Sequence, residues 1–283
     1  MKQVTERDYE ERIERIVKLL EADPAAHHAL DDLAGAAHFS RFHFHRIYRA
    51  MTGETVNDTA RRLRLARAAR QLASTNTAVT EIALDAGYES VQTFSRAFSS
   101  LTSLSPREFR SRRIRLSDLI NGPAPRAKGG TSMKVEIVEL MASRAFTYRH
   151  LGPMSTVKDT YSRLWQWQIE NGIAGKTREA IGICYGDETG DDEFRYYAGV
   201  VWDKPVKAAG DIEVHEVPGG KYGCYRLVGS HDGIPAAFQR IYGEWLPASG
   251  FAPDDRPALE IYRNNPFDTA ANELITDLMI PIR

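Results

Sequence analysis

Two internal duplications, one in each half of the chain, restrict the folds that this sequence can adopt. In the first half, LDDLAGAAHFS from Leu30 aligns with VTEIALDAGYE from Val79 at an offset of 49 residues, and FHRIYRAMT then aligns with FSRAFSSLT at an offset of 50. Each copy reads as a short helix, a tight turn and a second helix of about 10 residues. The pattern predicts a helix-turn-helix unit that occurs twice.

The second half repeats a different unit. Three pairs of segments align at offsets of 77 or 78 residues: YRHLG with YRLVG, YSRLW with FQRIY, and AIGICY with ALEIY. Each unit reads as strand, turn, helix and then strands, and apolar residues at helical spacing predict the buried side of each helix. These residues are Val157, Tyr161, Leu164, Trp165 and Ile169 in one helix, and Phe238, Ile241, Tyr242 and Trp245 in the other. We expect the two units to associate through their sheets about a pseudo-twofold axis, with a cleft between them.

The sequence therefore predicts a multidomain protein. An all-α duplicated helix-turn-helix domain, residues 9–112, is followed by a linker, residues 113–132, and by an α+β domain of two pseudo-symmetric strand-helix-strand-strand repeats, residues 133–283. The linker includes NGPAPRAKGGTS, which is rich in Gly and Pro. Residues 1–128 hold 21 Lys and Arg against 16 Asp and Glu, whereas the remainder holds 16 against 22. A basic half joined to an acidic half suggests a different partner for each.

Composition excludes several classes of protein. No stretch approaches the roughly 20 apolar residues of a membrane-spanning helix, and the charged first residues do not resemble a signal peptide. Cys184 and Cys224 are the only cysteines and form no CxxC motif. We expect a cytoplasmic, nucleoid-associated protein without a membrane segment, a structural disulfide or a cysteine-based zinc site.

The second helix of each first-half copy divides into two faces. The buried stripes are Phe44, Ile47, Tyr48 and Met51 in one copy and Phe94, Ala97, Phe98 and Leu101 in the other. The opposite faces carry Phe42, His45, Arg46 and Arg49 in one copy and Gln92, Ser95, Arg96 and Ser99 in the other. Most of these side chains can reach base edges or phosphates. With a helical spacer of about 28 Å between them, the two helices could enter successive major grooves of one duplex. An ordinary bundle with solvated faces is the alternative that the duplication disfavours.

Residues 9–112 resemble the AraC/XylS-type DNA-binding domain, on the pattern IALDAGYESVQTFSRAFSSLTSLSPREFR. The resemblance implies seven helices, two of which are recognition helices near residues 40–50 and 90–100. By position it implies DNA contacts from Arg41, Phe42, His45, Arg46, Gln92, Thr93 and Arg96. Double-stranded promoter DNA is the expected partner, and RNA polymerase is a further candidate.

The strand ALEIYRNNP, residues 258–266, points to the chemistry of the second half. Leu259 and Ile261 would face one way, and Glu260 and Tyr262 the other. The aligned strand AIGICY carries Gly182 where this one carries Glu260. Because a requirement of the fold would be expected in both copies, we interpret Glu260 as a carboxylate that recognises a ligand. All four tryptophans lie in this half, and aromatic rings beside a carboxylate favour an amphipathic cation.

Residues 133–283 resemble the GyrI-like, or SbmC-like, ligand-binding domain of multidrug-responsive regulators, on the repeat and on ALEIYRNNP. The resemblance implies a pocket between the repeats and a central glutamate, by position Glu260, that contacts a small-molecule effector. The candidate ligand-binding residues are Glu260, Tyr262, Trp167, Tyr185 and Tyr197.

Two other functions stay open at this stage. The second half could be a small-molecule hydrolase in which Glu260 and a tyrosine act as base and proton donor, or a protein-interaction module without a ligand. No nucleophile–base pair is evident, and His43 and His45 are interpreted as helix-surface residues. We expect a protein that is not an enzyme, with no catalytic residue, metal or cofactor.

Overall fold

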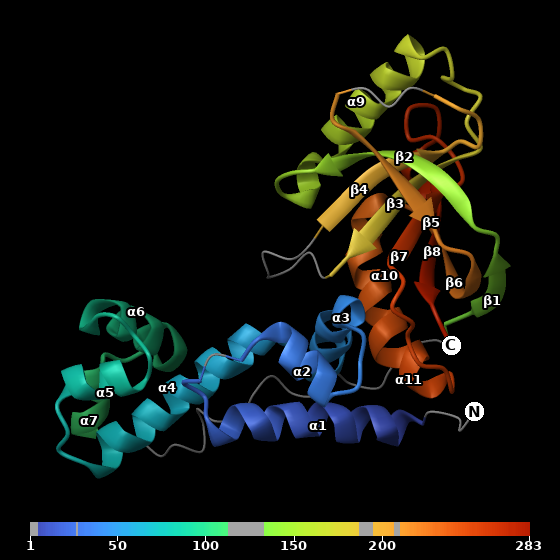
Figure 1. The fold of residues 1–283 in the computed structure, drawn as a ribbon. Helices are drawn as coiled ribbons and strands as arrows, with labels where there is room; N and C mark the ends of the chain where they lie inside the picture. Colours follow the sequence, from blue (N-terminus) through green and yellow to red (C-terminus); the bar gives the residue numbers. More distant parts are fainter. Residues whose placement is uncertain (1–4, 27, 113–132, 187–194, 207–209) are drawn as a thin grey trace. The chain divides into compact units, whose positions relative to one another are not determined.

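The computed structural model describes residues 5–26, 28–112, 133–186, 195–206 and 210–283 (Figure 1). Contacts group the chain into two compact units. Unit 1 comprises residues 1–9, 39–47 and 128–283, and unit 2 comprises residues 10–38 and 48–127. The predicted linker at residues 113–132 falls outside the described residues.

The described residues up to residue 112 form seven helices, as predicted. They are α1 (Glu6–Ala22), α2 (Leu30–Ala36), α3 (Arg41–Thr52), α4 (Val56–Ser74), α5 (Val79–Asp85), α6 (Val91–Thr102) and α7 (Pro106–Arg112). The spacer α4 has 19 residues. In the second copy, Phe94 and Phe98 are fully buried and pack with Phe109, which confirms the predicted stripe. The Ser90 hydroxyl caps α6 by accepting from the Thr93 backbone amide.

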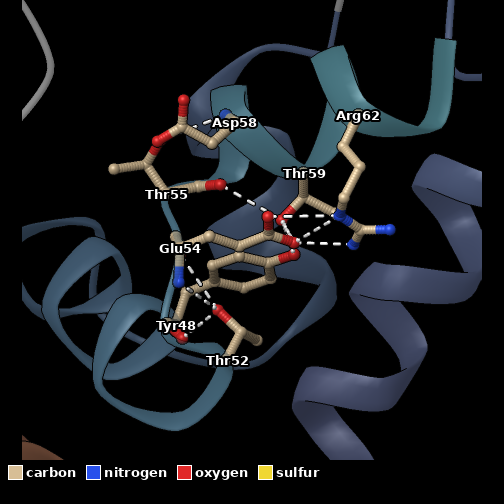
Figure 2. A network of polar contacts seen from close by, with 7 residues as sticks. All are labelled: Tyr48, Thr52, Glu54, Thr55, Asp58, Thr59 and Arg62. Atoms are coloured by element: carbon tan, nitrogen blue, oxygen red, sulfur yellow. Dashed lines mark hydrogen bonds and ion pairs between the residues drawn. The ribbon is translucent and has the colours of Figure 1, made fainter. Parts of the chain in front are cut away.

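The first copy holds a polar network where the second has apolar packing (Figure 2). Tyr48 donates to the Thr59 hydroxyl at 2.8 Å, Thr59 donates to Glu54 at 2.8 Å, and Arg62 donates to Glu54 at 2.6 Å. The residues 50 positions later in the second copy are Phe98, Leu104, Phe109 and Arg112. The second helix of the first copy is thus joined to α4 by hydrogen bonds and an ion pair, whereas that of the second copy is joined to α7 by apolar packing.

In the second half, the residues that the structure describes form one antiparallel sheet of eight strands. The strands are β1 (Val135–Leu140), β2 (Ser143–His150), β3 (Glu179–Tyr185), β4 (Arg195–Val201), β5 (Ile212–Val217), β6 (Gly220–Val228), β7 (Ala258–Tyr262) and β8 (Ile275–Pro281), and their order across the sheet is β1-β6-β8-β7-β3-β4-β2-β5. The edge strands are exchanged: β1 pairs with β6 of the second repeat, and β5 pairs with β2 of the first. The predicted association of two repeats through their sheets is confirmed.

The pseudo-twofold axis passes between the central strands β3 and β7. These strands are antiparallel, and Gly182 pairs directly with Glu260, its equivalent at the repeat offset of 78 residues. Paired residues project from the same face of a sheet, so the two equivalent positions adjoin each other on the axis.

Helical segments cover the face of the sheet that carries Glu260. They are α9 (Val157–Glu170), α10 (Ile234–Arg240), a π-helical turn (Ile241–Trp245) and α11 (Leu246–Ala248), with 3-10 turns at Met154–Thr156, His231–Gly233 and Ala271–Glu273. Trp167 of α9 stacks on Phe146 of β2, and Trp245 fills the space above Gly223 of β6. Through the strand pairing, both contacts lie on the Glu260 face.

The buried side of α9 differs from the prediction. Trp165 and Ile169 are 46% and 51% exposed, and the buried residues are Thr160, Leu164, Trp167 and Gln168. These four residues recur at helical spacing, but the buried face that they form is rotated about the axis of α9 relative to the predicted face. The rotation follows from Trp167, which packs on Phe146 and turns Trp165 outward. For the second helix the prediction holds at Phe238, Ile241 and Tyr242, which are buried.

Candidate functional site

Glu260 is a buried carboxylate on the central strand β7. Only 5% of the residue is exposed, and its neighbours Leu259 and Ile261 belong to the apolar cluster on the opposite face of the sheet. The predicted alternation along this strand is therefore confirmed. A carboxylate at this depth requires hydrogen bonds, since burying an unpaired one is very costly.

Tyrosine hydroxyls supply these hydrogen bonds. Tyr262 and Tyr196 both donate to Oε2 of Glu260, at 2.5 and 2.9 Å. Tyr161 of α9 donates to the Ile181 carbonyl and lies 3.0 Å from the Tyr196 hydroxyl. Within the described part of the chain, the other carboxylate oxygen, Oε1, has only the Cys184 thiol at 3.5 Å. Both tyrosine donors therefore bond Oε2 of Glu260, and Oε1 is only weakly bonded.

The groups around Glu260 are held in their neutral forms. Burial, with the nearby Glu260 charge, raises the pKa of Tyr161, Tyr196 and Tyr262 well above the usual value, so the three remain hydroxyl donors. The same two causes raise the pKa of Cys184 well above its usual value, which keeps it a thiol rather than a nucleophilic thiolate. Arg46 opposes these causes at Cys184, but the described hydrogen bonds to the carboxylate all come from neutral groups.

Gly182 makes room for this arrangement. A Cβ atom at residue 182 would overlap the Tyr196 hydroxyl and lie 3.0 Å from Oε2 of Glu260. The difference between the repeats thus has a steric cause, in addition to the role proposed for Glu260: across the pseudo-twofold axis, only one of two equivalent, adjoining positions can carry a large side chain.

The structure brings Tyr262 to Glu260 but not the other three candidate ligand residues. Tyr197 pairs with Ile183, and it lies with Tyr185 on the opposite face of the sheet. Trp167 is on the Glu260 face but packs into the core beneath α9. These three positions were expected to line the site with Glu260. In the structure they pack into the apolar clusters on the two faces of the sheet, where Trp167 and Tyr197 are buried and Tyr185 is partly buried.

Residues that complete the site were missing from the candidate set. They are Tyr161, Tyr196, Cys184 and His231, whose ring lies 5.1 Å from that of Tyr262. The alignment of β3 with β7 contained a signal for one of them: Cys184 is two residues from Gly182 and therefore on the same face. The positions of Tyr196 and His231 near Glu260 follow from strand pairing and turn geometry, which could not be predicted from the sequence.

The predicted DNA-facing residues differ between the two copies. On α6, Gln92, Thr93 and Arg96 are exposed and Ser95 is half-buried, in agreement with the prediction. On α3, Arg41 is exposed, whereas Phe42 and Arg49 are half-buried.

The expectation of solvent exposure is wrong for His45 and Arg46, which are each 8% exposed, and for His43, which is 1% exposed. Residues 39–47 belong to unit 1. There Arg46 donates from Nε to the Gly186 carbonyl at 2.9 Å and stacks on Phe238, while His43 bonds the Tyr242 hydroxyl at 2.7 Å. Burial lowers the pKa of His43 to about 4, so its ring is neutral at pH 7.

Within the described part of the chain, no three His, Cys, Asp or Glu side chains are grouped as a metal site would need. No described helix combines the length and apolar character needed to cross a membrane.

A family model described as a GyrI-like small molecule binding domain matches residues 133–283, which is more than half of the chain. The chain belongs to the GyrI-like family. A second model, described as a helix-turn-helix domain, matches residues 33–112.

This GyrI-like protein has relatives among transcriptional regulators. It is 30% identical over 108 residues to the HTH-type transcriptional activator AarP of Providencia stuartii, covering 38% of this chain and 80% of AarP. It is 36% identical over 83 residues to the regulatory protein SoxS of Escherichia coli K12, covering 29% of this chain and 78% of SoxS. The right origin-binding protein of the same strain is 24% identical over 270 residues, covering 90% of this chain and 92% of the relative. The chain thus joins an AraC-type helix-turn-helix region to a GyrI-like domain, as predicted.

Proposed function

We propose that this protein is a DNA-binding transcriptional regulator, not an enzyme, whose GyrI-like domain, residues 133–283, binds a small amphipathic cation. The observation that carries the proposal is Glu260. It is 5% exposed, and none of the described cationic side chains forms an ion pair with it. A buried carboxylate bonded only by neutral groups gains most from a cation that brings its own charge. Aromatic rings beside it add cation–π attraction of about 0.5–2 kcal/mol each.

The DNA-binding role rests on residues 9–112. We propose that promoter DNA contacts Gln92, Thr93, Ser95 and Arg96 of α6 and Arg41, Phe42 and Arg49 of α3, and that the protein acts at the nucleoid in the cytoplasm. His45 and Arg46 do not join this set, because both are buried in unit 1. RNA polymerase is a candidate partner at the promoter. The ligand regulates if it binds DNA-competent and DNA-incompetent states with different affinity, so the affinity for DNA should change when the cation is added.

Replacing Glu260 with glutamine is expected to weaken cation binding selectively. Tetraphenylphosphonium is a suitable probe because it combines a permanent charge with aromatic rings, and triphenylphosphine oxide is a neutral comparison. In Glu260→Gln, tetraphenylphosphonium should bind about 10–100-fold more weakly, the loss expected for a buried charged partner. Isothermal titration calorimetry on the full chain measures both ligands. Glu216→Gln, on the exposed edge strand β5, should change neither, and an equal loss of both ligands in Glu260→Gln would contradict the charge-partner role.

Replacing Arg96 with alanine is expected to weaken specific DNA binding by about 1–3 kcal/mol if its guanidinium reads a base. Arg96 is exposed on α6, so thermal stability should stay unchanged. Gel-shift titration against an operator selected from random DNA measures the effect. Ser100→Ala, at an exposed position of the same helix, is the control. Unchanged affinity in Arg96→Ala would remove α6 from the DNA interface.

A further inference from the structure

A second polar feature adjoins the Glu260 cluster. Thr276 of β8 pairs directly with Tyr262 of β7 on one side and with Leu227 of β6 on the other, so all three project from the Glu260 face. The turn at His231–Gly233 covers this row of residues. His231 contacts the Tyr262 ring at 5.1 Å, and the Cβ position of Gly233 lies 3.7 Å from Leu227. Thr276, between Leu227 and Tyr262, therefore lies beneath the turn.

At this point each of the two side chains has one buried polar atom without a hydrogen bond among the described residues. Thr276 is fully buried, and its hydroxyl has no hydrogen-bond partner among the described residues. The Nε2 atom of His231 is also buried and unpartnered among them. More than nine in ten buried polar groups in proteins are paired. In unit 1 the indole nitrogens of Trp167 and Trp202 are likewise unpaired, but only His231 and Thr276 both adjoin Tyr262.

The two groups can recognise a neutral polar group. Burial lowers the pKa of His231, against the opposing influence of Glu260 and Asp232, so its ring is uncharged at neutral pH. A neutral imidazole offers one donor and one acceptor, and a threonine hydroxyl offers both. Tyr262 connects this point with Glu260, because its hydroxyl bonds Oε2 and its ring contacts His231.

We propose that His231 and Thr276 form a second subsite for the effector, which recognises a hydroxyl or amide group that the ligand carries at a distance from its positive charge. This inference rests on the proposed function, because the same ligand would place its cation at Glu260 and its polar group past the Tyr262 ring. It narrows the ligand class from lipophilic cations to cations with a hydrogen-bonding group. Because Thr276 lies beneath the turn at His231–Gly233, ligand entry requires that turn to move.

The first test needs no ligand. Thr276→Val in the full chain removes an unpaired hydroxyl and keeps the shape of the side chain, so the melting temperature should stay the same or rise by about 1–4 °C. Thr147→Val is the matched control, since Thr147 is also fully buried but lies 2.9 Å from Nδ1 of His215 in a hydrogen bond. That variant should melt at a lower temperature. An equal fall in both variants would show that Thr276 is already paired in the protein and would overturn the subsite.

The second test uses two cations that differ by one hydroxyl, benzyltrimethylammonium and its 4-hydroxybenzyl counterpart. Wild type should bind the hydroxylated cation about tenfold more tightly, the size of one net hydrogen bond. In Thr276→Val this ratio should fall to about one, while the affinity for benzyltrimethylammonium stays unchanged. In His231→Phe the ratio should fall as well. In Glu260→Gln both cations should weaken together.

The outcomes separate the two proposals. If both cations bind wild type equally, or if the ratio survives in Thr276→Val and His231→Phe, the subsite is wrong and the proposed function stands. If neither cation binds wild type, the cation-binding function fails and the subsite fails with it.

Discussion

Replacing Gly182 with alanine is expected to destabilise the sheet by about 1–3 kcal/mol, the usual cost of overpacking a core, and to abolish high-affinity ligand binding. The added methyl group would overlap the Tyr196 hydroxyl and approach Oε2 of Glu260. Tyr196 cannot turn aside without leaving its hydrogen bonds, because it is 1% exposed and its hydroxyl lies between those of Tyr161 and Tyr262. The carboxylate would therefore lose a donor while it remains buried.

Urea denaturation followed by tryptophan fluorescence measures this effect, because all four tryptophans lie in residues 133–283. Gly233→Ala is the control, because it lies in the same unit, its φ of −76° suits alanine, and an added Cβ would lie 3.7 Å from Leu227, an ordinary contact distance; it should change the stability little. If Gly182→Ala left both stability and cation affinity at the wild-type level, the close packing at the pseudo-twofold axis would play no part in building the site.

The duplications allowed the fold to be predicted with unusual detail. Offsets of 49–50 and 77–78 residues gave the helix-turn-helix pair and the two strand-helix-strand-strand units, and the helices and strands occur where these units placed them. The exchange of β1 and β5 between repeats was not predictable in the same way. An edge strand can pair within its own repeat or with the other one, and local sequence does not distinguish the two pairings.

The site was predicted only in part. Period-2 alternation placed Glu260 and Tyr262 on one face, and the structure agrees. The aromatic content of the sequence did not show which rings lie near Glu260 and which lie in the apolar clusters. Trp167 and Tyr197 are aromatic like Tyr161 and Tyr196, and only the strand pairing and the rotation of α9 decide on which face each ring lies. His45 and Arg46 were expected to be exposed by the periodicity of α3. Periodicity reports only that two sides of a helix differ, and it cannot show that both are covered.

In both duplications, the two copies differ in a charged side chain. In each, a carboxylate in one copy has an uncharged counterpart in the other: Glu260 stands opposite Gly182 in the sheet, and Glu54 stands where the second helix-turn-helix copy has Leu104. At Glu260 no described side chain forms an ion pair, which is consistent with a ligand. At Glu54 the opposite charge is present, because Arg62 bonds it directly. The second case is therefore expected to be structural.

Replacing Arg62 with leucine is accordingly expected to lower the stability of the first helix-turn-helix copy by about 2–4 kcal/mol. The Glu54 and Arg62 side chains are 13% and 17% exposed, and removal of one member of a well-buried pair typically costs about 3–5 kcal/mol because the other charge is left uncompensated. Glu54 would keep one donor, Thr59 at 2.8 Å. The double variant Glu54→Leu, Arg62→Leu should recover most of the loss, since leucine is the residue that the second copy carries at Leu104.

Native-state hydrogen exchange of the α3 and α4 amides is the appropriate measurement for Arg62. The four tryptophans all lie in residues 133–283, so fluorescence would not report on this part of the chain, and a two-unit chain need not unfold in one transition. Glu54→Leu, Arg62→Leu and the double variant form a thermodynamic cycle. Strong positive coupling is the result expected of a buried ion pair that joins the segment after α3 to α4. Additive losses would mean that Tyr48 and Thr59 hold these helices together without the charges, by the same geometry that Phe98 and Phe109 provide in the second copy.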